Sequence, residues 1–241
     1  MALFTTESVR ANLRNKEGRR VFYLGPEDRL TPGARDFLRD HHIEILPAAQ
    51  AKPQSWRTPL GGEFRRKPEY MTHLNGETLV PKDHPRILFR GQADTLEADL
   101  LLAQWSAMEE GYRSVGTELG QCLELVRTIL ARDVLEQPLE QILLGGLDEE
   151  QLRARSHRPQ DFYGQPHFMP AWEQGRTLLL VNRARTTARA AELACYGAFR
   201  DREGLCTRED LLLAFNRLSS FLWILEIRLA SGKEERAHGK L

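Results

Sequence analysis

The chain has 241 residues, and its 34 Lys and Arg residues balance its 34 Asp and Glu residues, so the formal net charge is zero. This length is enough for one substantial core, or for a core with a small appendage. A protein that binds a polyanion usually carries a basic excess, so this balance argues against nucleic acid as a partner.

Residues 1–47 predict a small N-terminal β-α-β appendage. Val21–Leu24 and His41–Leu46 read as two short strands. Between them, Thr31 followed by Pro32 is a good helix start, with Thr as the N-cap and Pro at the first helical position. A unit this small buries little core, so we expect it to dock on the larger domain or on a neighbouring subunit.

Residues 48–69 have the Pro- and Gly-rich composition of a linker, and residues 70–241 predict a helical-bundle domain. We expect its first long helix to begin at Asp94, with Glu97 completing a capping box. The residues expected to face the core from this helix are Leu96, Leu100, Leu101, Trp105 and Met108.

The rest of the chain predicts more helices. A second helix carries apolar residues between Leu119 and Leu130, and Asp148–Gln151 opens a short one. A long helix is expected from about Trp172 to about Phe199, and Thr207–Asp210 is a plausible cap for a last helix that ends near residue 230. Four or five helices joined by modest loops predict a bundle.

The targeting and redox signals are sparse. No apolar run approaches the roughly 20 residues that span a bilayer, and the N-terminus lacks the apolar region of a secretory signal, so we expect a cytoplasmic protein. An amphipathic address for a bacterial microcompartment is one interpretation of Phe4–Leu13. The three cysteines, Cys122, Cys195 and Cys206, form no C-x-x-C pair and predict reduced, buried or half-buried thiols.

A polar, Gly-containing segment leads into the first helix. It offers Thr72, His73 and Lys82, and such loops hold phosphates because free backbone N–H groups and the positive end of the helix dipole face the anion. The chain contains no P-loop or dinucleotide fingerprint. An ordinary surface loop explains the same pattern.

Four polar residues lie on one face of the long helix. Asn182, Arg185, Arg189 and Glu192 are spaced three, four and three residues apart. Two arginines one turn apart suit a triphosphate, with Glu192 orienting Arg189 through an ion pair. The alternative is a solvated stripe of exposed charges, which contributes little.

The last helix carries polar residues on an apolar background. Asn216 and Ser220 lie one turn apart, and such residues must be paired or must face a ligand. An interhelical hydrogen bond is the plainer interpretation. Upstream, Phe168 and Met169 precede Pro170 in a loop, where a core-lining Phe is equally consistent with the sequence.

Three blocks in chain order carry a family resemblance. They are Lys82–Glu97, Ala184–Glu192 and Phe215–Ser220, and Leu30–Leu38 adds a fourth match near the start. Together they resemble ATP:cob(I)alamin adenosyltransferases of the ethanolamine-utilisation (EutT-like) type, which are related to the PduO-type enzymes. The resemblance implies a mainly α fold, with a four- to five-helix bundle in a ferritin-like up-and-down arrangement beside the β-α-β appendage.

The resemblance also implies a function. The 5′-deoxyadenosyl group of ATP would pass to cob(I)alamin, the corrinoid substrate, to form adenosylcobalamin with release of triphosphate. Arg185 and Arg189 would be the catalytic residues. The ATP would bind with Mg²⁺, and no residue of the chain is implied as a metal ligand. The residues implied for ATP are Thr72, His73, Lys82, Arg86, Arg90, Asp94, Arg185, Arg189, Glu192, Asn216 and Arg217, and those implied for the corrinoid are Phe168, Met169 and Ser220.

Partners follow from the same resemblance. It implies a homotrimer with each site shared between adjacent subunits, a flavoprotein reductase that supplies cob(I)alamin, and an adenosylcobalamin-dependent enzyme that takes the product. Some EutT-like relatives carry a His and Cys metal site in the linker. Residues 48–69 contain neither residue type, so we expect no transition metal there.

Two departures leave other functions open. The family's Arg-Arg-Ala-Glu reads Arg189-Ala190-Ala191-Glu192 here, and Ser220 stands where many relatives have Asp. A corrinoid-binding or delivery protein without turnover is therefore an alternative, as is a helical scaffold of a microcompartment.

Overall fold

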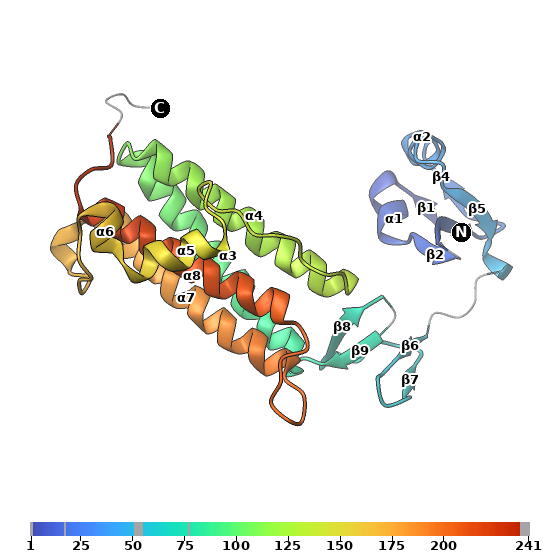
Figure 1. The fold of residues 1–241 in the computed structure, drawn as a ribbon. Helices are drawn as coiled ribbons and strands as arrows, with labels where there is room; N and C mark the ends of the chain where they lie inside the picture. The colour runs from blue at the N-terminus through green and yellow to red at the C-terminus, as the bar shows by residue number, and fades with distance from the viewer. Residues whose placement is uncertain (1, 17, 51–54, 77, 237–241) are drawn as a thin grey trace. The chain divides into compact units, whose positions relative to one another are not determined.

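The computed structural model describes residues 2–16, 18–50, 55–76 and 78–236. The chain forms two compact units, Met1–Lys67 and Pro68–Leu241 (Figure 1). The boundaries proposed from the sequence, after residues 47 and 69, remain predictions, and residues 51–54 of the proposed linker lie outside the described residues.

The first unit is built from short elements. In chain order they are β1 (Leu3–Phe4), α1 (Thr6–Ala11), β2 (Arg14–Lys16), β3 (Arg19–Leu24), β4 (Arg29–Leu30), α2 (Pro32–Asp40), β5 (Glu44–Pro47), the 3₁₀ turn Ala48–Gln50, β6 (Trp56–Arg57) and β7 (Glu63–Phe64). β3 pairs in parallel with β5 and antiparallel with β2, while β1 pairs in parallel with β4. β6 and β7 form an antiparallel pair inside the stretch predicted to be linker.

The predicted strand–helix–strand order of β3, α2 and β5 is confirmed, but the second strand begins at Glu44, not at His41, and includes Pro47. A crossover connection, here containing α2, is what allows β3 and β5 to pair in parallel. The Thr31 hydroxyl accepts a hydrogen bond from the Ala34 backbone N–H at 3.3 Å, and Pro32 opens the helix. Val9 of α1 is fully buried in this unit's apolar cluster, so the segment interpreted as an address packs at least one apolar side chain inward.

The second unit holds the long helices. Its elements are β8 (Met71–Asn75), β9 (Thr78–Pro81), α3 (Pro85–Glu109), α4 (Arg113–Leu135), α5 (Glu149–His157), α6 (Pro159–Tyr163), the 3₁₀ turn Trp172–Gln174, α7 (Arg176–Phe199) and α8 (Glu209–Ala230). The prediction of a mainly α protein is confirmed. None of the described helices is long and apolar enough to cross a membrane.

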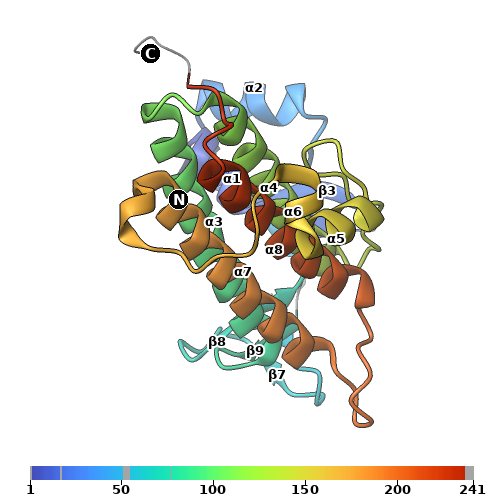
Figure 2. The same cartoon turned by 60° about the vertical axis from the view of Figure 1, so that its left-hand side comes forward.

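The four long helices lie side by side, as Figures 1 and 2 both show. α3 packs against α4 and α7, α7 packs against α8, and the short helices α5 and α6 pack against α8. The β8–β9 hairpin and the loop between α7 and α8 lie at one end of this group. Buried alanines at 184, 188 and 191 on α7 present small side chains to the core.

The start of α3 differs from the prediction. The helix begins at Pro85, with His84 as the N-cap, because Pro is well suited to the first helical turn and the His84 Nδ1 accepts from the Arg86 backbone N–H at 3.2 Å. Asp94 is therefore an exposed residue inside the helix and not a cap.

The core stripe of α3 also differs. Leu96 and Leu100 are fully buried, but Leu101 is 47% exposed and Trp105 is 54% exposed. Leu101 follows Leu100 by one residue, which rotates its side chain by about 100° around the helix and away from the core.

Two further boundaries are corrected. α7 starts at Arg176, not Trp172, since Gly175 adopts a positive φ of 90° that ends the preceding 3₁₀ turn. Thr207 does not cap α8, because its hydroxyl donates to the Phe199 carbonyl oxygen at 2.9 Å. In contrast, Asp148 caps α5 in a reciprocal capping box with Gln151, as predicted.

Candidate functional site

The predicted polar face of α7 lies at the border with α8. The buried residues Ala184, Ala188 and Ala191 anchor α7 in the core. Each is followed by a residue of the predicted face, namely Arg185, Arg189 and Glu192, respectively. One residue is about 100° of helix rotation, so these three side chains leave the core along one edge of α7.

A matching face of α8 receives them. Asn216, Ser219, Ser220, Trp223 and Glu226 are spaced three or four residues apart and so share one side of the helix. Glu192 accepts a hydrogen bond from the Asn216 side chain at 2.9 Å, and Arg185 forms an ion pair with Glu226 at 2.8 Å. These two bonds tie the antiparallel helices together at two levels.

A pocket opens between the two bonds and a nearby loop. Its volume is about 470 Å³, and its lining residues come from α5, the loop before α7, α7 and α8. They are Ser156, His157, His167, Phe168, Met169, Pro170, Arg185, Arg189, Ser219, Ser220 and Trp223. We call this the α7–α8 pocket.

Arg185 is held on three sides. Its Nε donates to Glu226 at 2.8 Å, its Nη2 donates to the Asn182 side-chain oxygen at 2.8 Å, and its guanidinium carbon lies 5.3 Å from the Trp223 ring centroid. Burial raises the pKa of Glu226 to about 7, although the nearby Arg185 acts in the opposite direction. Arg185 thus enters the pocket in a fixed orientation.

Arg189 is different. It is exposed at the pocket and makes no hydrogen bond or ion pair with any other described residue. The ion pair with Glu192 expected from the sequence is absent from the described contacts, because Glu192 accepts from Asn216. The α7–α8 pocket therefore carries one anchored cation and one uncompensated cation.

Aromatic rings line part of the pocket. Phe168 stacks on Trp223 with centroids 5.1 Å apart, and the His167 ring lies parallel to Trp223 at 5.8 Å. Met169 is 86% exposed beside them. The pocket thus combines apolar and aromatic side chains with two guanidinium groups, which suits a ligand with both an apolar part and an anionic group.

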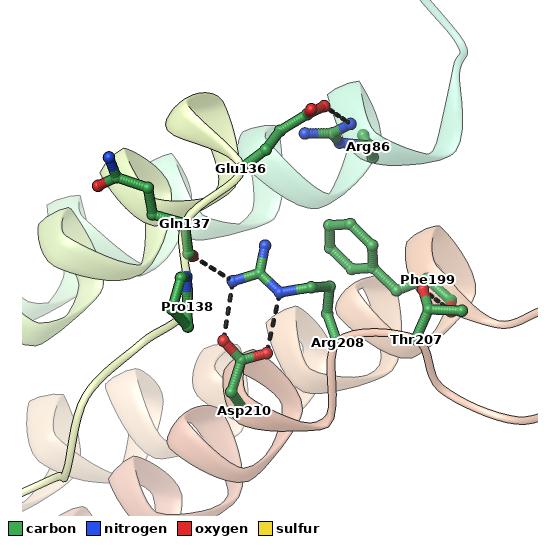
Figure 3. Close-up of a pocket in the computed structure, with 8 residues that line it drawn as sticks. All are labelled: Arg86, Glu136, Gln137, Pro138, Phe199, Thr207, Arg208 and Asp210. Carbon is green, nitrogen blue, oxygen red and sulfur yellow. Dashed lines mark hydrogen bonds and ion pairs between the residues drawn. The ribbon is translucent and has the colours of Figure 1, made fainter.

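A second pocket lies near the N-terminus of α3, and Figure 3 shows its eight lining residues. Arg208 pairs with Asp210, while Arg86 pairs with Glu136. The Phe199 ring lies between the two arginines, with their guanidinium carbons 5.5 and 5.9 Å from its centroid. The charges of this pocket are thus compensated within the chain.

Comparison with known proteins decides the family. A family model described as cobalamin adenosyltransferase matches residues 63–229. The corrinoid adenosyltransferase EutT of Escherichia coli is 30% identical over 250 residues, covering 93% of this chain and 91% of that protein. EutT of Salmonella typhimurium is 28% identical over 254 residues, with the same shares.

The chain belongs to the cobalamin adenosyltransferase family. It is therefore an enzyme of adenosyl transfer from ATP to a corrinoid, and the resemblance to the EutT type is confirmed.

Solved structures of related fold agree. A variant of the PduO-type ATP:corrinoid adenosyltransferase from Lactobacillus reuteri, complexed with cobalamin and ATP, matches with a TM-score of 0.51 at 18% identity, covering 71% of this chain and 96% of that chain. A second variant of that enzyme, with the same ligands, gives a TM-score of 0.52 at 20% identity over 70% of this chain and 89% of that chain. At this identity the likeness concerns the fold.

Within this cobalamin adenosyltransferase, the structure gathers five of the predicted residues in the α7–α8 pocket. They are Phe168, Met169, Arg185, Arg189 and Ser220. Glu192 and Asn216 bond to each other on the same pair of helix faces. Arg217 faces α5 instead, where burial, together with the nearby Arg153, lowers the pKa of its guanidinium.

The remaining predicted ATP residues lie on β8, the loop after β9, and α3. Thr72 and His73 are in β8, opposite Val80 and Leu79 of β9. Lys82 pairs with Glu69 at 3.1 Å on the surface. Their role at a nucleotide stays a prediction, as does that of Asp94.

Two of the predicted arginines hold a buried carboxylate. Asp133 on α4 is fully buried and pairs with Arg86 at 2.8 Å and with Arg90 at 2.6 Å. Arg90 Nη2 is buried without a hydrogen-bond partner among the described residues. These contacts tie α3 to α4 and give both arginines a structural task, whatever their part in nucleotide binding.

Trp223, which lines the pocket, and Glu226, which pairs with Arg185, were assigned no role from the sequence. A charge within a buried helix requires a partner, and that rule alone could have marked Glu226.

The remaining candidates for a chemical role are metal-binding groups and the three cysteines. In the described parts of the chain, no group of three or more His, Cys, Asp or Glu residues could hold a metal ion. The three cysteines are free, and burial raises the pKa of Cys195 to about 12. The predicted burial is confirmed, since Cys122 and Cys195 are buried and Cys206 is half-buried.

Proposed function

We propose that adenosyl transfer takes place at the α7–α8 pocket, with Arg185 and Arg189 facing the triphosphate of ATP and the Phe168–Trp223 surface facing the corrinoid. The observation that carries this proposal is the convergence of two guanidinium groups and an aromatic surface on one pocket. The relatives' names refer to corrinoid adenosyltransfer, and the solved relative contains both cobalamin and ATP.

Adenosyl transfer depends on the relative position of the two substrates more than on acid–base catalysis by the protein. The cobalt of cob(I)alamin donates an electron pair to the 5′ carbon of ATP, so a cobalt–carbon bond forms while the carbon–oxygen bond to the triphosphate breaks and its pair leaves with the triphosphate. Cob(I)alamin is a strong nucleophile, so no protein general base is required. The chain aligns the two reactants and stabilises negative charge on the leaving group.

The two arginines divide this work. Arg185, fixed by Glu226 and Asn182, offers its remaining N–H groups in one orientation, and Arg189 is free to follow the leaving group. Planar guanidinium groups bind phosphate oxygens with two parallel hydrogen bonds. Mg²⁺ accompanies ATP, since this ion usually binds phosphate oxygens and waters and needs few protein ligands.

The aromatic surface has a separate task. Phe168 and Trp223 present stacked apolar rings to the pocket, which would exclude water and the lower axial ligand from the corrinoid. Without that ligand, reduction to cob(I)alamin becomes accessible. Ser220 lines the same pocket, and its hydroxyl donates to the Asn216 carbonyl oxygen at 3.0 Å.

The assembly is part of the proposal. Lys82 and the β8–β9 residues Thr72 and His73 would reach the ATP of an adjacent subunit in a homotrimer. The helices would form the four- to five-helix, up-and-down bundle of the family, and the enzyme would work in the cytoplasm or in a microcompartment beside a flavoprotein reductase and an adenosylcobalamin-dependent enzyme.

The experiment is an incubation with ATP, Mg²⁺ and chemically reduced cobalamin, followed by absorption spectroscopy. We expect the spectrum of adenosylcobalamin with the wild-type chain and with Arg202→Ala, a control at an exposed arginine beyond the end of α7. A base-off spectrum without turnover would support a corrinoid carrier. An unchanged spectrum would support a scaffold and contradict the proposed site.

A further inference from the structure

Glu226 is a carboxylate in an apolar stretch of α8. Its neighbours Leu225 and Ile227 are fully buried, and so is Glu226 itself. Removing a carboxylate from water is unfavourable unless a partner compensates its charge. The presence of Glu226 at this position therefore calls for an explanation within the chain.

Arg185 is the partner that the structure provides. Its Nε donates to Glu226 Oε1 at 2.8 Å, while Oε2 is buried and has no hydrogen-bond partner among the described residues. The carboxylate thus depends on this one side chain for its hydrogen bond. The dependence is mutual, because Glu226 is the carboxylate that pairs with Arg185.

The pairing uses Nε of the Arg185 guanidinium and a carboxylate that does not line the pocket. With Nε on Glu226 and one N–H of Nη2 on Asn182, the plane of the group is set, and Trp223 lies 5.3 Å from its carbon. Nη1 and the second N–H of Nη2 donate to no other described residue and remain for a ligand. Arg189, one turn away, has no such anchor.

We propose that Glu226 is a positioning residue, which acts through Arg185 by holding its guanidinium toward the triphosphate during adenosyl transfer. The inference rests on the proposed function of the α7–α8 pocket. Glu226 is absent from the residues that line the pocket, so its effect on the reaction passes through Arg185. A displacement of about 1 Å in a positioned group can reduce a rate by about a hundredfold.

The test compares two substitutions at Glu226. Glu226→Gln keeps the shape and an acceptor for Arg185 Nε but loses the charge, and Glu226→Leu removes both. We expect kcat at saturating ATP and corrinoid to fall about tenfold for Glu226→Gln and about a hundredfold for Glu226→Leu. Circular dichroism and the melting temperature establish whether each variant is folded, and if Glu226→Leu does not fold, Glu226→Gln decides.

The matched control is another glutamate that pairs with an arginine and involves α8. Glu118 of α4 accepts from Arg228 of α8 at 2.8 and 2.9 Å and is away from the pocket lining. Glu118→Gln is expected to lower the melting temperature and leave kcat unchanged. If Glu226→Gln behaves in that way too, Glu226 is merely structural and the proposal is wrong.

A double-mutant cycle tests whether the effect of Glu226 on turnover passes through Arg185. If Glu226 acts through Arg185, adding Glu226→Leu to Arg185→Ala costs no further activity, whereas independent effects would multiply. Multiplied losses would overturn the proposal. The cycle also separates two failures, because wild-type turnover in Arg185→Ala would refute the proposed site, while an impaired Arg185→Ala beside a fully active Glu226→Leu would refute only the role of Glu226.

Discussion

Arg185 and Arg189 occupy one face of α7 but have unlike surroundings. Arg185 is anchored by Glu226 and Asn182, while Arg189 has no described partner. An anchored cation contributes to the fold and to the site, and a free cation contributes to the site alone. Substitution of Arg189 is therefore the cleaner test of function.

We expect Arg189→Ala to reduce turnover by about a hundredfold, or about 3 kcal/mol of transition-state stabilisation, because one charged donor to the leaving triphosphate is lost. The fold should persist, since the side chain is exposed and unpaired. Steady-state rates at saturating ATP, with circular dichroism as the control, measure both effects. Wild-type turnover in this variant would show that Arg189 does not bind the triphosphate.

Glu226 gives the stability a pH dependence. Its pKa is raised from 4.5 to about 7 by burial, with Arg185 as the charged group opposite it. Between these two values the folded chain binds a proton that the unfolded chain releases, so this contribution is full below about pH 4.5 and is lost as the pH rises through about 7.

Glu226→Gln removes that dependence. Between pH 5 and pH 8 we expect the free energy of unfolding of the wild type to fall, relative to this variant, by up to about 3 kcal/mol. Urea unfolding at pH 5, 6, 7 and 8 measures the difference. Parallel curves for the two proteins would place the pKa of Glu226 near its ordinary value.

At the scale of elements, α3 and α4 are joined by Asp133. The carboxylate is fully buried and holds both Arg86 and Arg90. We expect Asp133→Ala to destabilise the chain by about 3–5 kcal/mol, because it removes the buried carboxylate that pairs with both guanidinium groups. Chemical denaturation measures the loss.

Glu136→Gln is the control for Asp133. Glu136 pairs with Arg86 too, but its side chain is 57% exposed. An exposed pair contributes about 0–1 kcal/mol, so this variant should unfold almost like the wild type. Equal losses in the two variants would mean that burial does not set the strength of these contacts.

Local signals predicted several elements correctly. Thr31 and Pro32 marked α2, and Asp148 with Gln151 marked α5, because caps act within one turn of the chain. The start of α3 was missed because Asp94 and Glu97 have the spacing of a capping box within a helix that already began at Pro85. A cap-like pair is only a cap if the preceding residues are not helical.

The sequence predicted which site residues share a helix face, but not which residues of other helices they contact. The spacing of Arg185, Arg189 and Glu192 placed them on one face, and the structure agrees. Their partners depend on which helix packs alongside, so neither the Glu192–Asn216 bond nor the Arg185–Glu226 pair followed from spacing. The second pair joins residues that are 41 positions apart.

At the scale of the whole molecule, the predicted ATP residues fall into two groups. Thr72, His73 and Lys82 lie in or just after the β8–β9 hairpin, and Arg185 and Arg189 line the α7–α8 pocket. A homotrimer with a site at each interface would combine the two groups from adjacent subunits. The proposal predicts that each group can be supplied by a different chain.

Mixing of two inactive variants tests this arrangement. We expect Lys82→Ala and Arg189→Ala subunits, mixed and allowed to exchange, to regain part of the wild-type turnover, because some interfaces then receive both intact halves. Light scattering of the wild type should give the mass of three chains. A monomer at micromolar concentration, or no rescue after proven subunit exchange, would contradict the shared site.

The alanines of α7 have a consequence for how the family can vary. Ala184, Ala188 and Ala191 are fully buried, and each immediately precedes Arg185, Arg189 or Glu192. Saturation mutagenesis should therefore show pairs of adjacent positions along this helix that do not tolerate substitution. Substitution of the alanine should lower the amount of folded protein, whereas substitution of the residue after it should lower activity in a protein that still folds. Evolution could change the chemistry at the second positions only while the first stay small, because a larger side chain there would push α7 outward and carry the reactive face with it.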